Sequence, residues 1–448
     1  MEKKKLSMLR RGTKRKRNKG GMIGKLKPIL LLLIVVLCLA VWLVASFRTL
    51  VFEQSESGSL HLSSNLHMPL NTKDLKLRDS YSSKQESGAL PPYESPTLIF
   101  TCSRANYLTD TLQTIHDNIS TACSMGCPIV VSQDRDMPDV TKVIQDFKAK
   151  FEAKGVPFFH IQHPVAGLLR GNPYQLLAVH YGWALRTLFD GKVYNQYPLP
   201  QRVIILEEDL RIAPDFFDYF EATAPYLDKD PTLLAISAFN DNGFQGQVAD
   251  PKRLLRSDFF PGLGWMMTRN TWLNDLGSKW PNGYWDDWLR EPAQRQGRQF
   301  IRPEITRTFH FGEKGGASHN QFGTNHNRVM LNTEKVDWKS QDLSYLEPDK
   351  FGRMYADMIS KAKLVQTKEQ ALKEVQQGND ARMEYQGGIP GYARLSREIQ
   401  LMTDEKAGIF RTAYKGVVET RLDGKNFLFL TPPEGELKSN FGGYWPDS

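Results

Sequence analysis

An apolar run that ends in three carboxylates constrains this chain more than any other feature. Residues 203–206 are Val-Ile-Ile-Leu, and Glu207, Glu208 and Asp209 follow directly. Consecutive apolar, β-branched residues predict a strand that is covered on both faces, as in a parallel sheet flanked by helices. Burying three unpaired charges would be too costly. The acids are therefore expected at the carboxyl end of the strand, where open α/β sheets bind ligands.

Carboxylate oxygens at that edge suit a hard divalent cation, Mg²⁺ or Mn²⁺, that carries a diphosphate. The alternative is a strand end capped by acids that are merely solvated. The triplet by itself leaves both interpretations open.

Strands and helices alternate on both sides of the triplet. We predict strands at 97–101, 128–132 and 156–160, helices at 107–117, 138–151 and 173–189, and a further helix that starts at Pro214 with Asp215 in its first turn. This order predicts βαβ units and a mainly parallel sheet, hence an α/β fold. Because parallel strands end at one edge, Arg104 and Asp134, which follow the first two strands, are expected beside the triplet.

The amino-terminal segment predicts a membrane anchor. Residues 1–28 hold twelve Lys or Arg against one acid, and an uncharged, apolar run follows at 29–47, long enough to cross a bilayer as a helix. Basic residues on its amino side place that side in the cytosol, a type II orientation. A cleaved signal peptide is the alternative, but the apolar run is longer than usual and no clear small-residue cleavage site follows.

The net charge of +8 describes this basic tail and not a binding surface. Subtracting the +11 of residues 1–28 from the total of +8 leaves −3 for the rest of the chain. This balance argues against nucleic acid as a partner. Beyond the anchor we predict a polar stem at 48–95, a catalytic domain at 96–325, a linker at 326–349 and a small mixed domain at 350–448.

Four cysteines exclude a disulfide-rich scaffold. Cys38 lies in the predicted anchor, which leaves Cys102, Cys123 and Cys127, so at most one disulfide forms among these three. The sequence does not say whether Cys123 and Cys127 pair. Asn118 begins an Asn-Ile-Ser glycosylation sequon that is usable if this part of the chain is luminal.

Two adjacent carboxylates bracketed by tryptophans form a second candidate site. Residues 284–288 are Tyr-Trp-Asp-Asp-Trp. Indoles offer apolar walls that suit the faces of a sugar, and a partly desolvated carboxylate can act as a general base. The alternative is a helix start with capping acids and core tryptophans.

Two glycine-containing loops complete the candidates. Residues 258–265 predict a constrained loop that either approaches a ligand or is a packing turn. Residues 312–319 have the small, polar composition of a lid, or of an ordinary surface loop.

In this order the motifs resemble the N-acetylglucosaminyltransferase I family. The resemblance runs from about residue 96 to the carboxyl terminus. It is carried by the triplet and by residues 215–217, 237–243, 257–265, 280–281, 285–290 and 301–304. It implies a GT-A nucleotide-sugar domain, Mn²⁺, a UDP-GlcNAc donor, a high-mannose N-glycan acceptor and a type II Golgi membrane protein.

The resemblance also implies residue roles. Asp209 is expected to be the metal ligand, and Asp286 the catalytic base of a single inverting displacement. The expected donor-binding residues are Arg104, Asp134, His180, Glu207, Glu208, Leu263 and Ser318.

Two departures from the family pattern matter. The middle acid of the triplet is Glu208 where the family usually has Asp, which moves its oxygens by one methylene. Cysteines paired in animal members are also missing, because Arg135, Ala235 and Phe300 stand where three of the four would be.

Three other functions are alternatives to this one. A transferase that adds GlcNAc to protein O-mannose is one, although animal members of that branch carry an extra amino-terminal domain for which this stem is too short. A catalytically inactive, lectin-like membrane protein is another, against which intact Asp209 and Asp286 argue. A glycoside hydrolase would need acids on opposite sides of the substrate, which adjacent Asp286 and Asp287 do not easily supply.

Overall fold

The computed structural model describes residues 94–119, 127–164, 171–193, 199–314 and 323–446. Contacts divide the chain into the units Met1–Ser87 and Gly88–Ser448, and every described residue belongs to the second. No helix in this described part is long and apolar enough to span a membrane. The predicted tail and anchor, and the stem up to residue 93, lie outside it.

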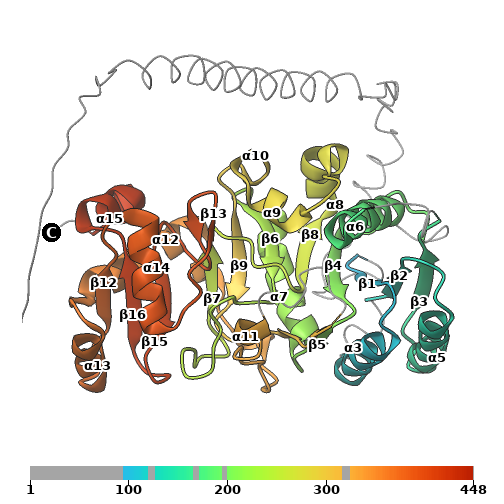
Figure 1. Ribbon diagram of the computed structural model, residues 1–448, viewed down its shortest axis with the longest axis horizontal. Helices are drawn as coiled ribbons and strands as arrows, with labels where there is room; N and C mark the ends of the chain where they lie inside the picture. The colour runs from blue at the N-terminus through green and yellow to red at the C-terminus, as the bar shows by residue number, and fades with distance from the viewer. Residues whose placement is uncertain (1–93, 120–126, 165–170, 194–198, 315–322, 447–448) are drawn as a thin grey trace, which may run out of the picture. The chain divides into compact units, whose positions relative to one another are not determined.

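In the described residues, eight strands form the large sheet in the order β3-β2-β1-β4-β8-β6-β9-β7 (Figure 1). The strands are β1 (Thr97–Thr101), β2 (Ile129–Gln133), β3 (Phe158–Gln162), β4 (Arg202–Glu207), β6 (Leu233–Ser237), β7 (Leu254–Ser257), β8 (Trp265–Thr268) and β9 (Gln299–Pro303). The first four pair in parallel, as do β6 and β9. β8 and β7 run antiparallel to their neighbours. The prediction of a mainly parallel sheet in an α/β fold is confirmed.

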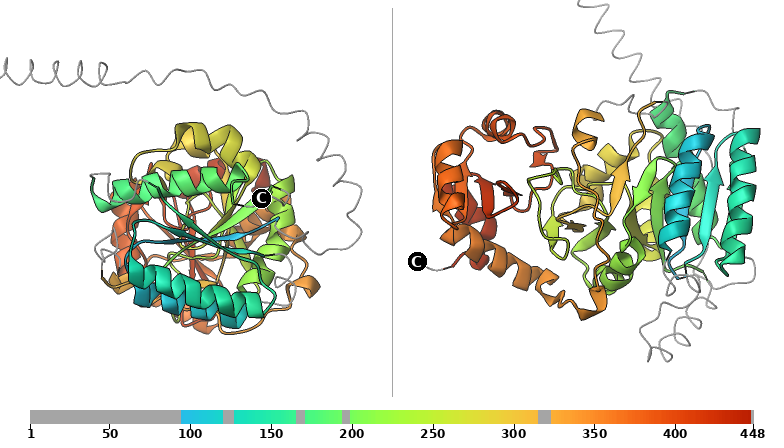
Figure 2. Two further views of the ribbon diagram at one scale, coloured as in Figure 1. Left: turned by 90° about the vertical axis from the view of Figure 1, so that its right-hand side faces the viewer. Right: turned by 90° about the horizontal axis from the view of Figure 1, so that it is seen from below.

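Helices cover both faces of this sheet, and α6 lies across the sheet from α3 and α5 (Figure 2). Their bounds are α3 (Ala105–Asn118), α5 (Pro138–Ala153) and α6 (Pro173–Phe189). In β4, Val203 and Ile205 join the core on the α6 side, whereas Ile204 and Leu206 join the core with α3 and α5. Each β-strand residue turns to the opposite face from the one before it, so a continuous apolar run is what two covered faces require.

The remaining elements follow in the chain. Near the site they are β5 (Leu210–Ile212), α7 (Phe216–Lys229), α8 (Arg269–Thr271), α9 (Trp285–Arg290), α10 (Pro292–Arg295), β10 (Thr308–His310) and α11 (Gly323–His326). A second sheet, in the order β11-β12-β16-β15, is formed by Lys363–Leu364, Ala381–Glu384, Phe427–Thr431 and Val418–Arg421. Its region also contains α12 (Pro348–Lys361), α13 (Lys368–Gln376), α14 (Gly388–Ile399), α15 (Glu434–Phe441) and the hairpin β13–β14 (Glu405–Lys406, Ile409–Phe410).

Asp215 differs from its prediction. The helix begins at Phe216, and the Asp215 carboxylate is fully buried. It accepts hydrogen bonds from Arg307, Asn332 and Trp338. The acid is therefore held in a buried ion pair and does not serve the first turn of α7.

Buried apolar residues stand at two of the positions where the family has cysteines, and the retained Cys102 forms no disulfide. Ala235 and Phe300 lie opposite each other in the pairing of β6 with β9, and both are buried. Cys102 is a free thiol. Cys127 is disulfide-bonded, and its partner lies outside the described residues.

Candidate active site

The three carboxylates separate at the end of β4 because successive side chains turn to opposite faces. Glu207 faces α6, where the Tyr181 hydroxyl donates to its Oε1 at 2.8 Å. Burial, and then the negative charge of Asp209, raise the pKa of Glu207 to about 7. Glu207 thus lies on the side of the sheet that also carries α9.

Glu208 points to the opposite side and is held by the end of β1. Its Oε1 accepts from Arg104 Nε at 2.7 Å, and its Oε2 accepts from the backbone N–H of Cys102 at 3.1 Å and from the Thr101 hydroxyl. The longer side chain in place of the usual Asp is therefore fully bonded here.

Asp209 lies against Arg104 and His310. Its Oδ2 is 2.8 Å from Arg104 Nη2 and 3.4 Å from His310 Nε2. Burial would raise the pKa of Asp209, but the contact with His310 and the charge of Arg104 outweigh it and lower the pKa. Only 4% of Glu208 and 3% of Asp209 are exposed, so the interpretation as merely solvated acids is wrong.

The surroundings of Asp209 fit a divalent cation. Its Oδ1 is buried and has no hydrogen-bond partner, although buried carboxylate oxygens normally have one. Gly312 passes so close that a Cβ there would lie 2.3 Å from Oδ2. Among the described residues no group of three or more His, Cys, Asp or Glu is arranged as a complete metal site. A cation at Asp209 would therefore need further ligands from the donor or water.

Asp134 directly follows the end of β2, and His180 of α6 contacts the same strand through Ser132. Asp134 Oδ1 is 2.9 Å from His163 Nδ1, and the Ser132 hydroxyl is 2.7 Å from His180 Nε2. The rings of His163 and His180 stack with centroids 5.5 Å apart. Burial lowers the pKa of His180 to about 3, so its imidazole is neutral. The expectation that Asp134 meets the edge of the triplet is supported by Cys102, which contacts both Asp134 and Glu208.

Asp286 and Asp287 lie in the first turn of the short helix α9. Neither caps the helix, because the N-cap residue is Tyr284 and makes no side-chain cap bond. Both carboxylates instead accept from Arg290 Nη1, at 3.0 Å and 2.9 Å. The acids are thus not capping residues.

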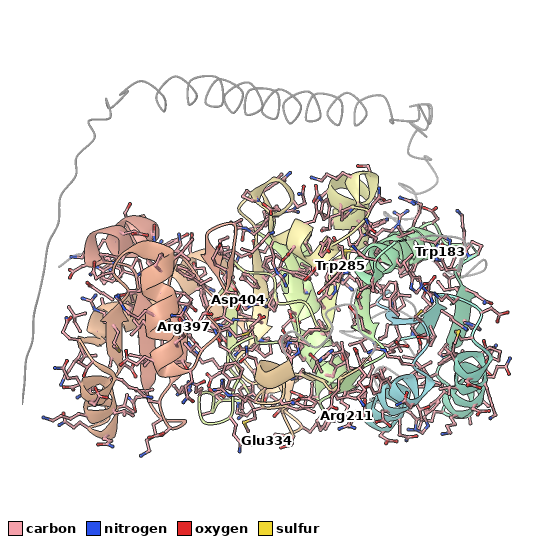
Figure 3. All side chains as sticks on the ribbon, in the orientation of Figure 1. Trp183, Arg211, Trp285, Glu334, Arg397 and Asp404 are labelled. Carbon is pink, nitrogen blue, oxygen red and sulfur yellow. The ribbon has the colours of Figure 1, made fainter. Side chains whose placement is uncertain are left out.

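Trp285 does belong to the core and links α9 to the triplet. It lies over the middle of the large sheet (Figure 3), with its ring centroid 4.5 Å from that of Tyr181, whose hydroxyl bonds Glu207. Burial, and then the charges of Asp286, Asp287, Tyr284 and Glu207, raise the pKa of Tyr174. The Tyr174 ring stacks on that of Tyr284 with centroids 4.6 Å apart, so the start of α9 and the triplet meet at the same pair of α6 tyrosines, Tyr174 and Tyr181.

The loop before β8 is constrained as predicted. Gly262, Leu263 and Gly264 all have positive φ, of 71°, 46° and 95°. The Leu263 carbonyl accepts from the Thr308 hydroxyl, which fixes the loop against β10. Ser318 lies outside the described residues, so its expected role stays a prediction.

Sequence reasoning missed His310, Arg290 and Tyr181. His310 reaches Asp209 only because β10 pairs with β5, directly opposite Leu210. No local pattern signals that pairing. Arg290, by contrast, stands three and four residues after the two aspartates, a spacing at which helical side chains meet.

Comparisons with known proteins agree with these motifs. The GNT-I family profile matches residues 65–443. The alpha-1,3-mannosyl-glycoprotein 2-beta-N-acetylglucosaminyltransferase of Arabidopsis thaliana is 37% identical over 353 residues, which cover 79% of this chain and 77% of that protein.

Among solved structures, S. aureus TarS in complex with UDP-GlcNAc is 12% identical with a TM-score of 0.33, covering 61% of this chain and 68% of that one. The mannosyltransferase PcManGT from Pyrobaculum calidifontis, in complex with GDP-Man and Mn²⁺, is 12% identical with a TM-score of 0.28, covering 64% and 70%. Both structural likenesses are distant, so the assignment stands on the sequence matches. This chain belongs to the GNT-I family.

Proposed function

We propose that this chain transfers GlcNAc from UDP-GlcNAc, in β-1,2 linkage, to the α-1,3-arm mannose of the five-mannose N-glycan. This step starts the synthesis of hybrid and complex N-glycans. Family membership supports the donor and the reaction. The observation that carries the proposal in the structure is that the start of α9, which bears Asp286, packs on α6 beside Glu207. Tyr174 stacks on Tyr284, and Tyr181, whose hydroxyl bonds Glu207, stacks on Trp285.

Asp286 is the proposed general base. The Arg290 guanidinium donates to its carboxylate and so orients it. The carboxylate accepts the proton of the mannose hydroxyl as that oxygen attacks the anomeric carbon. A single displacement inverts the configuration, so the α-linked donor gives a β-linked product.

The triplet forms the donor side of the site. Asp209 would hold Mn²⁺, which when bound neutralises the diphosphate and makes UDP a better leaving group. Arg104 pairs with both Glu208 and Asp209 and is a further proposed donor contact. Asp134, His180, Leu263 and Ser318 are the further proposed donor contacts.

We also propose a Golgi location with a single type II span at 29–47, which places the catalytic unit in the lumen. The domain boundaries at 325 and 350 remain part of this proposal.

The assay uses the compact unit Gly88–Ser448. A start at residue 96 would remove Glu94 and Ser95, which bond the Arg202 side chain, and Glu94 also accepts from the Arg202 backbone. We expect transfer of one β-1,2-linked GlcNAc to the five-mannose N-glycan with Mn²⁺. Asp286→Asn should lower kcat by about 10²–10⁴-fold.

Asp287→Asn is the matched control, because both acids bind Arg290. An α-linked product would refute the inverting mechanism, and equal losses in both variants would refute the assignment of the base. Transfer to an O-mannosyl peptide and not to the N-glycan would favour the O-mannose enzyme. Donor binding without turnover on either acceptor would favour an inactive, lectin-like protein.

A further inference from the structure

Tyr284 is an exposed aromatic residue at the start of α9, two residues before Asp286. Its side chain is 50% exposed, more than any other large apolar side chain in the described part of the chain. The neighbouring Trp285 is only 5% exposed, so the core covers the faces of its indole. The aromatic face that this segment offers to a ligand therefore belongs to Tyr284 and not to Trp285.

The backbone conformation of Tyr284 does not favour a tyrosine. Its φ and ψ are both 46°, in the left-handed region, where glycine and asparagine are more stable than an aromatic residue. A half-exposed ring also adds little to the core. Neither the turn nor the packing explains why this residue is aromatic, and residues held in this conformation cluster at ligand-binding sites.

The start of α6 holds the Tyr284 ring in place. The ring stacks on Tyr174 with centroids 4.6 Å apart and an angle of 22° between the planes. The preceding Gly283 lies so close to α6 that a Cβ there would be 3.2 Å from Gln175 Cγ. The stacked ring is therefore oriented before a ligand binds, which lowers the entropy cost of binding.

Polar groups lie around the same helix. Lys406 Nζ of β13 is 3.7 Å from Asp287 Oδ2 and 3.3 Å from Glu291 Oε1, and all three side chains are partly exposed. A pyranose has an apolar C–H face and a rim of hydroxyls, so its site needs an apolar surface and several hydrogen-bonding groups. The region around α9 supplies both.

We infer that Tyr284 is an acceptor-binding residue, whose ring stacks on the apolar face of a mannose of the acceptor glycan. The inference rests on the proposed function, which makes Asp286 the base that contacts the acceptor hydroxyl. The Cα atoms of Tyr284 and Asp286 are at most about 7 Å apart, so a sugar bound at Asp286 is within reach of the ring. Glu207, on the proposed donor side, bonds instead to Tyr181, two helical turns or about 10 Å along α6 from Tyr174.

Steady-state kinetics on the full-length chain in detergent test the inference, with UDP-GlcNAc, Mn²⁺ and the five-mannose N-glycan. Tyr284→Asn removes the ring but keeps a residue that tolerates the left-handed conformation. We expect its acceptor KM to rise about tenfold, with the donor KM and kcat within about twofold of the wild type. Tyr284→Phe keeps the ring and should leave all three values unchanged. Leu273→Asn, at an apolar side chain that is 43% exposed, is the control and should also change none of them.

The outcomes separate the inference from the proposed function. An unchanged acceptor KM in Tyr284→Asn, or a rise in the donor KM in its place, overturns the inference alone. Transfer only to an O-mannosyl peptide overturns the proposed acceptor, and the same KM comparison with that peptide then decides the inference. No turnover by the wild type on either acceptor overturns both.

A second measurement decides if Tyr284→Asn does not fold. The wild type is labelled with 3-fluorotyrosine, and the ¹⁹F resonance of Tyr284 is identified by its loss in Tyr284→Phe. We expect this resonance to shift when the five-mannose N-glycan is added in the presence of UDP and Mg²⁺. A resonance that stays in place while the glycan binds overturns the inference.

Discussion

Arg290 holds both carboxylates of the Trp-Asp-Asp-Trp segment and anchors them to the loop before β8. Its Nη1 donates to Asp286 and Asp287, and its Nε donates to the Phe260 carbonyl at 3.1 Å. Arg290→Met should leave the donor KM nearly unchanged and lower kcat by about 10²-fold, because the base loses its orientation. Steady-state kinetics at saturating acceptor measure this.

Arg298→Lys is the control for that experiment. Arg298 is also paired with a carboxylate, Asp275 at 2.7 Å, but does not contact Asp286. The positioning role fails if this control loses as much activity, or if Arg290→Met raises the donor KM without changing kcat.

His180 makes the stability of the chain depend on pH. Its folded pKa of about 3 lies below the unfolded value of about 6.5, so the unfolded state binds more protons between these values. The contribution of neutral His180 is complete above pH 6.5 and is lost as the pH falls. We expect a loss of about 2 kcal/mol between pH 7 and pH 5.

Guanidinium unfolding at several pH values checks this contribution. In His180→Gln the free energy of unfolding should fall less steeply between pH 7 and pH 5. Identical slopes in the two proteins would contradict the assignment to His180.

Single residues were predictable where one strand end was enough to place them. Arg104 meets Glu208 and Asp209 because β1 and β4 are parallel neighbours whose carboxyl ends share an edge. His310 was not predictable, because its position depends on a pairing between segments almost 100 residues apart. Asp215 was misplaced because only tertiary contacts show the partner of a buried charge.

Among the elements, the loop from Gly262 to Gly264 has a backbone conformation, with positive φ at all three residues, whose effect on stability can be measured. Gly264 has φ +95°, and a Cβ there would lie 2.6 Å from Thr308 Cγ2. Gly264→Ala should lower the free energy of unfolding by about 2–4 kcal/mol, since it adds a steric clash to an unfavourable backbone conformation. Chemical denaturation measures the change.

Gly246→Ala is the matched control. Gly246 has φ +80°, but nothing lies within 4 Å of the added Cβ. It should cost only about 1 kcal/mol, the conformational part alone. Equal costs at both positions would show that the contact with Thr308 does not constrain the loop.

At the same scale, prolines and apolar runs located most elements well. α5 and α6 begin at the predicted residues, Pro138 and Pro173, since proline is suited to the first helical turn. β3 is displaced by two residues from its prediction, to Phe158–Gln162. The antiparallel insertion of β8 between β4 and β6 was not predicted, because strand order depends on contacts that no local pattern encodes.

Across the whole molecule, the segment predicted as a linker packs into the core. Trp338 and Leu346 are buried, and Trp338 Nε1 donates to Asp215 at 2.9 Å. Further on, Arg421 pairs with Glu304, Nε to Oε1 at 2.7 Å, which joins β15 to the chain just after β9. Composition indicated a connecting segment but could not show that its few apolar residues reach the core.

The buried pair of Asp215 and Arg307 is central to this association, because Asp215 also bonds Asn332 and Trp338 from the following segment. Both side chains are fully buried, so removing one partner leaves an uncompensated charge. Asp215→Ala should lower the free energy of unfolding by about 3–5 kcal/mol.

Asp218→Ala is the control. Asp218 lies in the first turn of α7, 4.0 Å from Lys335, and its replacement should change the free energy of unfolding by less than about 1 kcal/mol. Adding Arg307→Met to Asp215→Ala removes the stranded charge, so recovery of stability in the double variant is expected, and a purely additive loss would contradict the buried-charge account.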